Sequence, residues 1–298
     1  MNKEIMDFLK MNDVKYKEKQ KLSEISPIKI GGEADFVVFP DCERKLICLI
    51  CYFESAKIRH RVVGRMSNLL PPDDQYNGVI IRTDRMRDIT FDNHIVTVGC
   101  GVSLPSLCRA AANHDLGGLE PLSGIPGSIG GATLGNAGAF GREISSLITS
   151  VRVYDKMTGS VDNLCADQCD FSYRHSIFKG GRYVILSVDL LLVPSITSVV
   201  RAEIQRYGEI RRQTQPSSPS LGSTFKRVSE NLSASRLIDE CGQKGTRIGG
   251  VEISRKHAGF IINVDNGSAA EYLALANFAK DRVKEKYNIP LVMEVEIL

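Results

Sequence analysis

Glycine is concentrated in one short stretch of this 298-residue chain, and that stretch limits what the chain can fold into. Residues 117–141 hold nine of the 26 glycines and carry almost no charge before Arg142. They include the segments GIPGSIGG (124–131) and NAGAFG (136–141). Backbone without side chains can approach a phosphate closely and offer it amide groups. The stretch therefore predicts either a structural turn or a nucleotide cradle.

Two common nucleotide motifs do not fit these glycines. No Lys-Ser or Lys-Thr pair follows them, so the stretch is not a P-loop. The glycine spacing also differs from the Rossmann fingerprint, and no acidic residue stands at the required distance after a first strand. On these residues alone, the turn and the cradle remain equally open.

Composition excludes several partners. The net charge is +3 and both signs are interspersed, so no basic run is available to follow a nucleic-acid backbone. The longest apolar run, VILSVDLLLVP, is interrupted by Ser187 and Asp189 and is too short to cross a bilayer. The N-terminal residues lack the apolar core of a signal peptide. We expect a cytoplasmic protein without nucleic-acid or membrane partners, existing as a monomer or weak homo-oligomer.

The eight cysteines stand mostly inside apolar segments, as buried thiols do. Neither Cys48 and Cys51 nor Cys165 and Cys169 has a second pair at zinc-finger spacing, so we expect reduced thiols and no metal.

Hydrophobic periodicity predicts alternating helices and strands, with a domain boundary near residue 200. The segment 41–56 has helical spacing behind an Asp41 cap and is flanked by strands, as in a βαβ unit. Further helices are expected at 105–114, 198–213, 233–242 and 268–287, and strands at 78–83, 94–99, 150–155, 183–192, 259–263 and 291–297.

Four further motifs suggest chemistry, and each also has a plain structural interpretation. GRMSN (64–68) follows a strand and offers amides and hydroxyls to a diphosphate, but it also fits a β-turn. GSTFK (222–226) places a hydroxyl beside a glycine and a cation, which suits a proton donor better than a nucleophile. Arg174 in FSYRHS suits a developing anion or an ordinary ion pair, and Glu294 suits acid–base chemistry or an exposed strand face.

In order along the chain, these motifs resemble those of the UDP-N-acetylenolpyruvoylglucosamine reductase family. The resemblance covers nearly the whole chain and adds KIGGEADFVVFP (29–40), IGGVEISRKHAGFIIN (248–263) and MEVEI (293–297). The length, and the lack of an inserted tyrosine-bearing loop, resemble the family's shorter subclass.

The resemblance implies an α+β fold: a two-part FAD-binding region of the vanillyl-alcohol-oxidase (PCMH) type and a smaller α+β substrate-binding domain. It implies FAD-binding subdomain 1 at 1–83, joined by a terminal strand at 293–298. Subdomain 2 is expected at 84–203 and the substrate-binding domain at 204–292.

The implied reaction has two halves: NADPH reduces FAD, and the reduced flavin passes a hydride to the β-carbon of UDP-N-acetylglucosamine enolpyruvate. The product is UDP-N-acetylmuramate, a precursor of peptidoglycan. Ser223 corresponds to the family's proton donor to the α-carbon, and Arg174 and Glu294 to its catalytic cation and acid.

The remaining implied residues hold the cofactor and the substrate. The cofactor set is Gly64, Arg65, Met66, Ser67, Asn68, Leu69, Pro121, Ser123, Gly124, Ile125, Pro126, Gly127, Ser128, Gly130, Gly131, Asn136, Ala137 and Gly138. Tyr173 and Lys226 are the substrate contacts that stand in matching motifs, and Arg212, Gln215, Lys256 and His257 are added from charge and position.

The chain departs from the family where the usual Gly-x-Gly-Ser-Asn turn has Met66 as its second glycine. If that position needs a positive φ, Met66 is strained by about 1 kcal/mol or more. Val228 follows GSTFKR where proline or glycine is usual, and Glu296 stands where a basic residue is commoner. Two alternatives stay open: a flavin oxidoreductase with another substrate, and a non-catalytic nucleotide-sugar-binding protein with a weakened flavin site.

Overall fold

The structure, a computed structural model, describes residues 2–298 and divides into two compact units. Unit 1 comprises Met1–Glu18, Phe36–Arg65 and Gly78–Ile210, and unit 2 comprises Lys19–Asp35, Met66–Asn77 and Arg211–Leu298. Each unit has its own cluster of buried apolar side chains, so each is built around a separate hydrophobic core.

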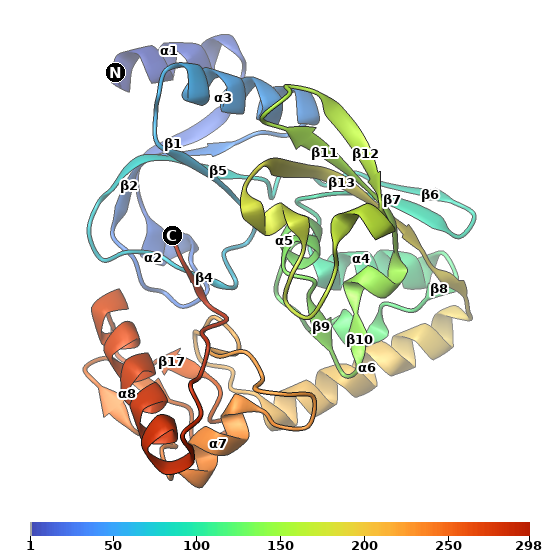
Figure 1. Cartoon of the computed structure of the whole chain (residues 1–298). Coiled ribbons are helices and arrows are strands. Elements are labelled where there is room, and N and C mark those ends of the chain that lie inside the picture. Colours follow the sequence, from blue (N-terminus) through green and yellow to red (C-terminus); the bar gives the residue numbers. More distant parts are fainter. Residues whose placement is uncertain (1) are drawn as a thin grey trace. The chain divides into compact units, whose positions relative to one another are not determined.

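Helices and strands are labelled as in Figure 1, with η for 3₁₀ helices. The first half of the chain forms α1 (Asn2–Met11), β1 (Lys15–Lys21), α2 (Leu22–Ile25), β2 (Glu33–Phe39), α3 (Glu43–Ser55), β3 (His60–Val63), β4 (Leu69–Leu70), β5 (Tyr76–Arg82), β6 (Ile89–Asp92), β7 (Ile95–Gly99), α4 (Leu104–Asn113), β8 (Leu116–Gly117), η1 (Glu120–Leu122), α5 (Ile129–Leu134), β9 (Gly138–Ala139), β10 (Arg142–Glu143) and η2 (Ile144–Leu147).

The second half forms β11 (Ile148–Asp155), β12 (Val161–Cys165), η3 (Ala166–Cys169), η4 (Ile177–Gly180), β13 (Tyr183–Leu191), β14 (Val193–Pro194), α6 (Thr197–Thr214), α7 (Ala234–Glu240), β15 (Arg247–Ile248), β16 (Val251–Ile253), β17 (Ile261–Asn263), α8 (Ala269–Tyr287) and β18 (Glu296–Ile297). This mixture of helices and mostly antiparallel strands confirms the predicted α+β class.

The largest sheet of unit 1 has the strand order β12-β11-β13-β7-β6 and is antiparallel throughout (Figure 1). Alternate residues of β13, such as Leu186, Val188 and Leu190, are fully buried, which is the period of two that a strand with one covered face requires. The short helix α5 packs against β13 and β7. The glycine-rich segment is therefore fixed to the central strands of this sheet.

A second sheet has the order β1-β2-β5-β3, and its strands β3 and β5 pair in parallel. The order β2, α3, β3 along the chain matches the strand–helix–strand order of the predicted βαβ unit, and β5 lies between the two strands in the sheet. Helix α3 buries Leu46, Leu49, Ile50 and Phe53 at helical spacing. The predicted Asp41 cap is wrong, because Cys42 is the N-cap residue and the Asp41 carboxylate accepts a hydrogen bond from Lys45 at 3.2 Å instead.

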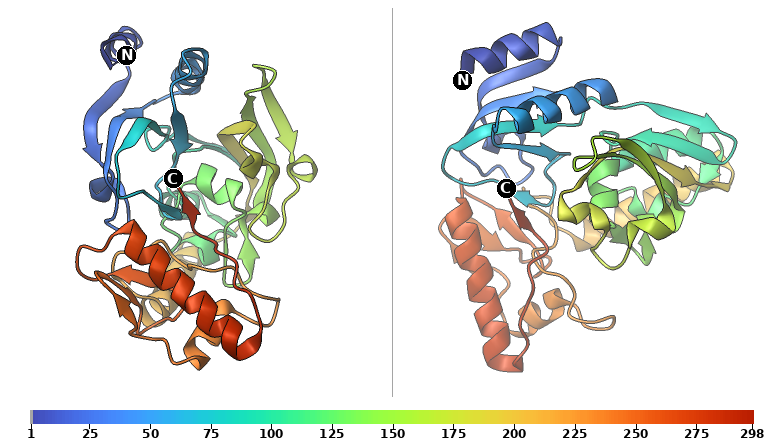
Figure 2. Two further views of the ribbon diagram at one scale, coloured as in Figure 1. Left: turned by 60° about the vertical axis from the view of Figure 1, so that its left-hand side comes forward. Right: turned by 45° about the horizontal axis from the view of Figure 1, so that its top comes forward.

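Unit 2 contains a three-stranded sheet, β15-β16-β17, which packs against the long helix α8 (Figure 2). Helix α8 begins with a capping box between Ser268 and Glu271. The Asp73 carboxylate accepts hydrogen bonds from the amides of Ala269 and Ala270 at 2.6 and 2.9 Å. It ends at Asn288, whose φ of +55° terminates the helix in the left-handed region.

The predicted C-terminal strand 291–297 is mostly wrong. Only Glu296–Ile297 forms a strand, β18, which pairs in parallel with β4; before it, Met293 makes a single bridge to Phe225. The predicted division into three parts stays a prediction: the compact units join residues 66–77 to 211–298, and their boundary falls inside α6, between Ile210 and Arg211.

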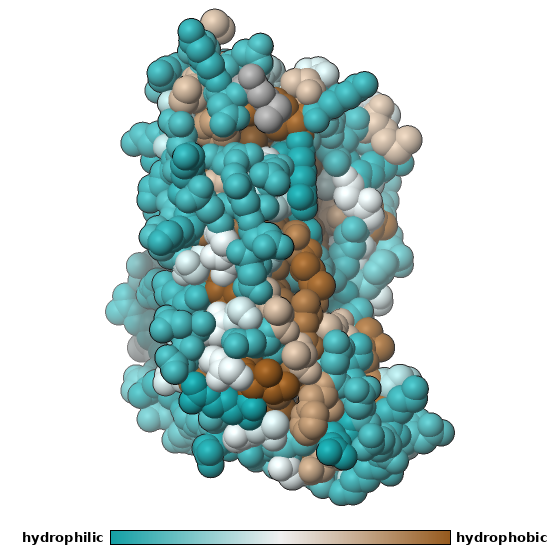
Figure 3. Space-filling model, turned by 90° about the vertical axis from the view of Figure 1, so that its left-hand side faces the viewer, coloured by the Kyte–Doolittle hydropathy of each residue, from teal (hydrophilic) through white to brown (hydrophobic). Residues whose placement is uncertain are grey.

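One face of the molecule is predominantly hydrophilic in Figure 3, as the interspersed charges of both signs suggest. No helix within residues 2–298 is long and apolar enough to cross a membrane. The eight cysteines are free thiols, and burial raises the pKa of the Cys100 and Cys108 thiols to about 12.

Candidate active site

The motif GSTFK is held in place in unit 2 through Thr224. The Thr224 amide donates to the Gly259 carbonyl at 2.8 Å, and its carbonyl accepts from the Glu294 amide at 2.9 Å. Gly222 has a φ of +79°, a conformation that a residue with a Cβ rarely adopts. Ser223 lies between these two residues and is half-buried. The segment that carries the Ser223 hydroxyl is therefore held mainly by the hydrogen bonds of Thr224.

The same hydrogen bond brings Glu294 beside the Ser223 segment. Met293 bridges Phe225, and the Lys226 amide donates to the Val292 carbonyl at 2.9 Å, so the two segments run antiparallel here. Glu294 is half-buried and precedes β18. Two of the three predicted catalytic residues, Ser223 and Glu294, therefore stand on paired segments of one unit.

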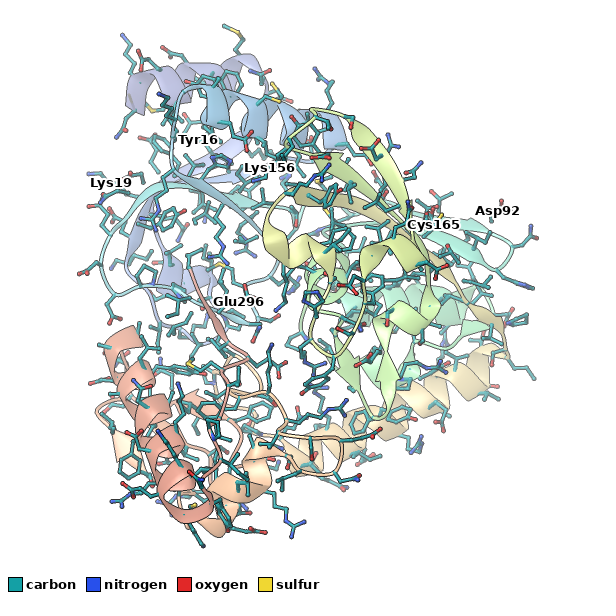
Figure 4. All side chains as sticks on the ribbon, viewed as in Figure 1. Tyr16, Lys19, Asp92, Lys156, Cys165 and Glu296 are labelled. Atoms are coloured by element: carbon teal, nitrogen blue, oxygen red, sulfur yellow. The ribbon has the colours of Figure 1, made fainter. Side chains whose placement is uncertain are left out.

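The turn after β3 adjoins this pair. The Asn68 side-chain amide donates to the Glu294 carbonyl at 2.9 Å, and the Glu296 amide donates to the Asn68 carbonyl at 3.1 Å. Figure 4 labels Glu296, the first residue of β18. In unit 2, the predicted flavin turn and the predicted acid are consequently joined by direct hydrogen bonds.

The positive φ considered for Met66 is present. Met66 has a φ of +58° and is 4 % exposed, so a buried methionine occupies the left-handed region. Across the described residues, the backbone amides of Met66, Ser67 and Asn68 donate to no acceptor in the chain. Free amides in consecutive residues are the groups that bind phosphate oxygens. The turn fits a diphosphate in spite of the methionine.

In unit 1, the other half of that turn meets the glycine-rich segment. A Cβ on Gly64 would lie 2.2 Å from the Ser128 hydroxyl oxygen, and a Cβ on Gly130 would lie 2.9 Å from the Cys100 Cβ. Ser128 is the N-cap of α5, and its hydroxyl accepts from the Gly131 amide at 3.3 Å. A side chain at 64 would displace the Ser128 hydroxyl and one at 130 would press on Cys100, so the two glycines let these segments pack closely.

Ser128, Ser123 and Asn136 are buried, and the buried hydroxyl of Thr133 has no hydrogen-bond partner among residues 2–298. A polar atom left unpaired in this way favours a polar group that the bare chain does not supply. The segment therefore fits a bound cofactor.

Asn136 serves the protein more than a ligand. Its side chain donates to Glu143 and to the Ser172 carbonyl, each at 3.0 Å, and accepts from the Ser145 amide at 3.2 Å. It thereby ties the glycine-rich segment to the loop that carries Arg174.

Arg174 is the third predicted catalytic residue and belongs to unit 1. Its guanidinium donates to the carbonyls of Asn136 and Gly138 at 3.4 Å and lies 5.0 Å from the Tyr173 ring centre. Its φ is +56°, an unusual conformation that the surrounding hydrogen bonds maintain. Arg174 is thus held against the predicted flavin segment, whereas Ser223 and Glu294 belong to unit 2.

The predicted substrate contacts have different surroundings. Lys226 is half-buried, and its ammonium group has no partner within the described part of the chain. Gln215 likewise has no side-chain partner there, and Arg212 is exposed. Lys256 donates to the Arg212 carbonyl, which satisfies the end of α6. His257 accepts from the Gly259 amide at 3.1 Å, and burial lowers the pKa of its imidazole. Lys226 is therefore the cation in this set most available to an anion.

Sequence reasoning missed the residues that hold Ser223 in place. Thr224 stood inside a recognised motif but received no role, and Tyr272, whose hydroxyl contacts it at 3.1 Å, gave no signal because it resembles any buried residue of an amphipathic helix. No cluster of His, Cys, Asp or Glu in residues 2–298 could hold a metal ion.

Comparison with known proteins identifies the family of this chain. A family model described as "FAD binding domain" matches residues 34–164, which include β3, the Gly64 turn and the glycine-rich segment. The fold and this match define an FAD-dependent oxidoreductase. A second model, "UDP-N-acetylenolpyruvoylglucosamine reductase, C-terminal domain", matches residues 214–298.

Two whole proteins specify the family. The UDP-N-acetylenolpyruvoylglucosamine reductase of Streptococcus pneumoniae (strain JJA) is 38 % identical over 299 residues, covering 100 % of this chain and 98 % of that protein. The crystal structure of the UDP-N-acetylenolpyruvylglucosamine reductase of Thermus caldophilus has a TM-score of 0.79 and 30 % identity, covering 95 % of this chain and 98 % of that one. The chain belongs to the UDP-N-acetylenolpyruvoylglucosamine reductase family.

Proposed function

We propose that this flavoenzyme reduces UDP-N-acetylglucosamine enolpyruvate to UDP-N-acetylmuramate in peptidoglycan precursor synthesis, with Ser223, Glu294 and Arg174 as its catalytic residues. The reaction follows from the family. The roles of Ser223 and Glu294 are supported by their pairing within unit 2, whereas the role of Arg174 is proposed from its motif. The observation that carries the roles is the 2.9 Å hydrogen bond from the Glu294 amide to the Thr224 carbonyl, which pairs the acid's segment with that of Ser223.

Apart from Arg65, the cofactor set supplies amides, hydroxyls and close backbone approaches and no charge. FAD, when bound, accepts a hydride from NADPH and delivers it to the β-carbon of the enolpyruvyl group. In unit 1, Gly64 lets the turn pack closely on Ser128, and in unit 2 the backbone amides of Met66, Ser67 and Asn68 are free and suit a diphosphate.

Ser223 donates its hydroxyl proton to the α-carbon, so that one hydride and one proton together saturate the double bond. Hydride addition leaves negative charge on the substrate beside its own carboxylate, and a preorganised cation and acid stabilise that charge. Arg174 supplies the cation and Glu294 the acid. Because a serine hydroxyl has a high intrinsic pKa, the half-buried Lys226 ammonium favours the departure of its proton.

The observations give less support to the non-catalytic alternative. It rested on Met66, but the free amides of the turn and the buried unpaired hydroxyl of Thr133 suit a bound cofactor. A cytoplasmic location, a monomeric or weakly associated state, and the absence of nucleic-acid or membrane partners are proposed from composition alone.

The visible absorption spectrum, recorded without oxygen, tests the function in two steps. Flavin bands should bleach when NADPH is added and return when the UDP-sugar enolpyruvyl ether is added. Ser223→Ala should leave the bleaching intact and slow the return by about 10²- to 10⁴-fold, the usual contribution of a positioned proton donor. If both steps fell together in this variant, the role of Ser223 would be wrong.

A protein that binds no FAD even when FAD is supplied would instead overturn the enzymatic function. The binding-protein alternative would then take its place.

A further inference from the structure

The geometry points to Tyr272 as a positioning residue that acts through Thr224 on the two catalytic groups of unit 2, Ser223 and Glu294. This inference rests on the proposed function. Tyr272 stands in the middle of α8, nearly fifty residues from Ser223 in sequence, and no motif marks it.

Ser223 cannot fix its own position. Within residues 2–298 its side chain makes no hydrogen bond, and Gly222 before it has open space around its α-carbon. The segment therefore depends on the residue that follows. Thr224 is 1 % exposed and takes part in four hydrogen bonds, more than any other residue of the motif.

The four bonds of Thr224 connect it to different parts of unit 2. Its amide reaches Gly259 and its carbonyl receives the Glu294 amide, while its hydroxyl receives the Ile261 amide at 3.4 Å. The fourth bond joins the Thr224 hydroxyl to the Tyr272 hydroxyl at 3.1 Å. Thr224 is consequently the point at which β17, α8, the Ser223 segment and the Glu294 segment meet.

The Tyr272 hydroxyl is fully buried, and Thr224 is its one hydrogen-bond partner in the described chain. Burial raises the pKa of this phenol, so it stays protonated and neutral at physiological pH and is not itself a proton source. Phenylalanine would fill the same core volume. The hydroxyl therefore contributes a hydrogen bond that holds the Thr224 side chain, and the backbone on either side of it, in one orientation.

Small displacements matter at this point because proton transfer requires the donor within hydrogen-bond reach of the accepting atom. A misplacement of about 1 Å from a residue outside the reacting groups can slow a reaction about a hundredfold. Reduction of the flavin by NADPH does not use Ser223, so it should be insensitive to Tyr272. The two half-reactions thus separate a positioning role from a general loss of structure.

Helix α8 supplies a matched control. Tyr287 is near the end of the same helix, and its hydroxyl donates to Glu240 at 2.8 Å on the exposed side of unit 2. Tyr272→Phe and Tyr287→Phe each delete one hydrogen-bonded phenol from α8. Of these two tyrosines, only Tyr272 contacts Thr224.

The test measures both half-reactions of the FAD-loaded full-length enzyme by stopped-flow absorbance. In Tyr272→Phe we expect reoxidation by the enolpyruvyl substrate to slow by about tenfold or more. Flavin reduction by NADPH and the substrate dissociation constant should stay within about twofold, and the solvent deuterium isotope effect on reoxidation should rise as proton transfer becomes limiting. Tyr287→Phe should resemble the wild type in every measurement.

Two substitutions of Thr224 extend the test. Thr224→Val, which removes the hydroxyl, should slow reoxidation as Tyr272→Phe does, and Thr224→Ser, which keeps it, should restore most of the rate. Should Thr224→Val not fold, Tyr272→Phe and Thr224→Ser still decide the question.

Reoxidation at the wild-type rate in Tyr272→Phe, or an equal slowing of both half-reactions, would overturn the positioning role. A wild-type enzyme that the substrate cannot reoxidise would instead overturn the proposed function.

Discussion

The side-chain amide of Asn68 donates a 2.9 Å hydrogen bond to the backbone carbonyl of Glu294, although the two residues are 226 positions apart in sequence. In return, the Glu296 amide donates a 3.1 Å hydrogen bond to the Asn68 carbonyl, and β18 pairs with β4. The turn proposed to hold the flavin diphosphate and the proposed catalytic acid are thereby two parts of one hydrogen-bonded structure in unit 2.

Asn68→Ala should loosen the C-terminal segment. Loss of one hydrogen bond costs about 1 kcal/mol, so the amides of Glu296 and Leu298, which depend on this segment, should exchange with deuterium about fivefold faster. Mass-spectrometric hydrogen exchange measures this directly. Gln75→Ala, which deletes an exposed 2.7 Å bond to Asp35 in the same unit, is the control and should leave these amides unchanged. If the amides of Glu296 and Leu298 exchanged as slowly in Asn68→Ala as in the wild type, the pairing of β18 with β4 alone would hold the segment.

The buried side chain of Met66 should stabilise the protein by more than its strained backbone conformation destabilises it. Replacement by glycine relieves about 1 to 2 kcal/mol of left-handed strain. It also removes a buried methionine side chain, which costs about 2 to 5 kcal/mol when truncated. Burial outweighs strain, so Met66→Gly should lower the free energy of unfolding of the FAD-free protein, as urea denaturation would measure.

Lys57 is the control for this balance. It has a φ of +52°, but its side chain is exposed, so Lys57→Gly should relieve strain without losing burial and should raise stability slightly. If Met66→Gly also raised stability, strain would dominate at both positions.

Replacing the buried, unpaired Gln243 side chain with an apolar one should stabilise the protein. Its side chain is 3 % exposed, and neither its amide nitrogen nor its oxygen has a partner among the described residues. An unpaired buried polar group costs about 1 to 3 kcal/mol. Gln243→Leu, which has similar volume, should therefore raise the free energy of unfolding by a similar amount. Gln213→Leu, on the exposed surface of α6, should change it by less than about 0.5 kcal/mol.

The sequence predicted best those elements whose signals are local. Helix α8 was expected at 268–287 from its amphipathic pattern and is found at Ala269–Tyr287, where Ser268 and Glu271 form a capping box at its start. Gly64 was expected only as part of a flavin-binding turn, and its close contact with Ser128 was not predicted, since it joins segments more than sixty residues apart.

Predictions failed where the partner is distant. Residues 291–295 are mostly apolar, as in a buried strand, but their partner is the irregular GSTFK segment, so they form one bridge and separate hydrogen bonds instead. One local signal also failed: Asp41 has the chemistry of an N-cap, but its carboxylate accepts from Lys45, only four residues further along the chain. Tyr272 could not be found at all, because a buried tyrosine reveals its partner only in the folded chain.

Acid should weaken unit 1 through Asp155, at the end of β11. Asp155 is 2 % exposed. The Arg182 Nε donates one hydrogen bond that the two Asp155 carboxylate oxygens share, at 3.0 and 2.9 Å, and the Arg182 Nη2 donates a second. Hydrogen bonding from Arg182 lowers the pKa of Asp155 to about 2, whereas an unfolded aspartate has a pKa of about 3.9. Because the folded pKa is the lower one, the interaction is fully present above about pH 4 and is lost as the pH falls toward about 2.

Thermal melting from pH 7 to pH 2 tests this dependence. Asp155→Asn should melt below the wild type at neutral pH, and the difference should shrink between about pH 4 and pH 2, where the wild type loses the same interaction. Asp167→Asn removes an exposed carboxylate and should run parallel to the wild type throughout. A difference between Asp155→Asn and the wild type that stays constant down to pH 2 would mean that the ionised carboxylate is not what stabilises this end of the sheet.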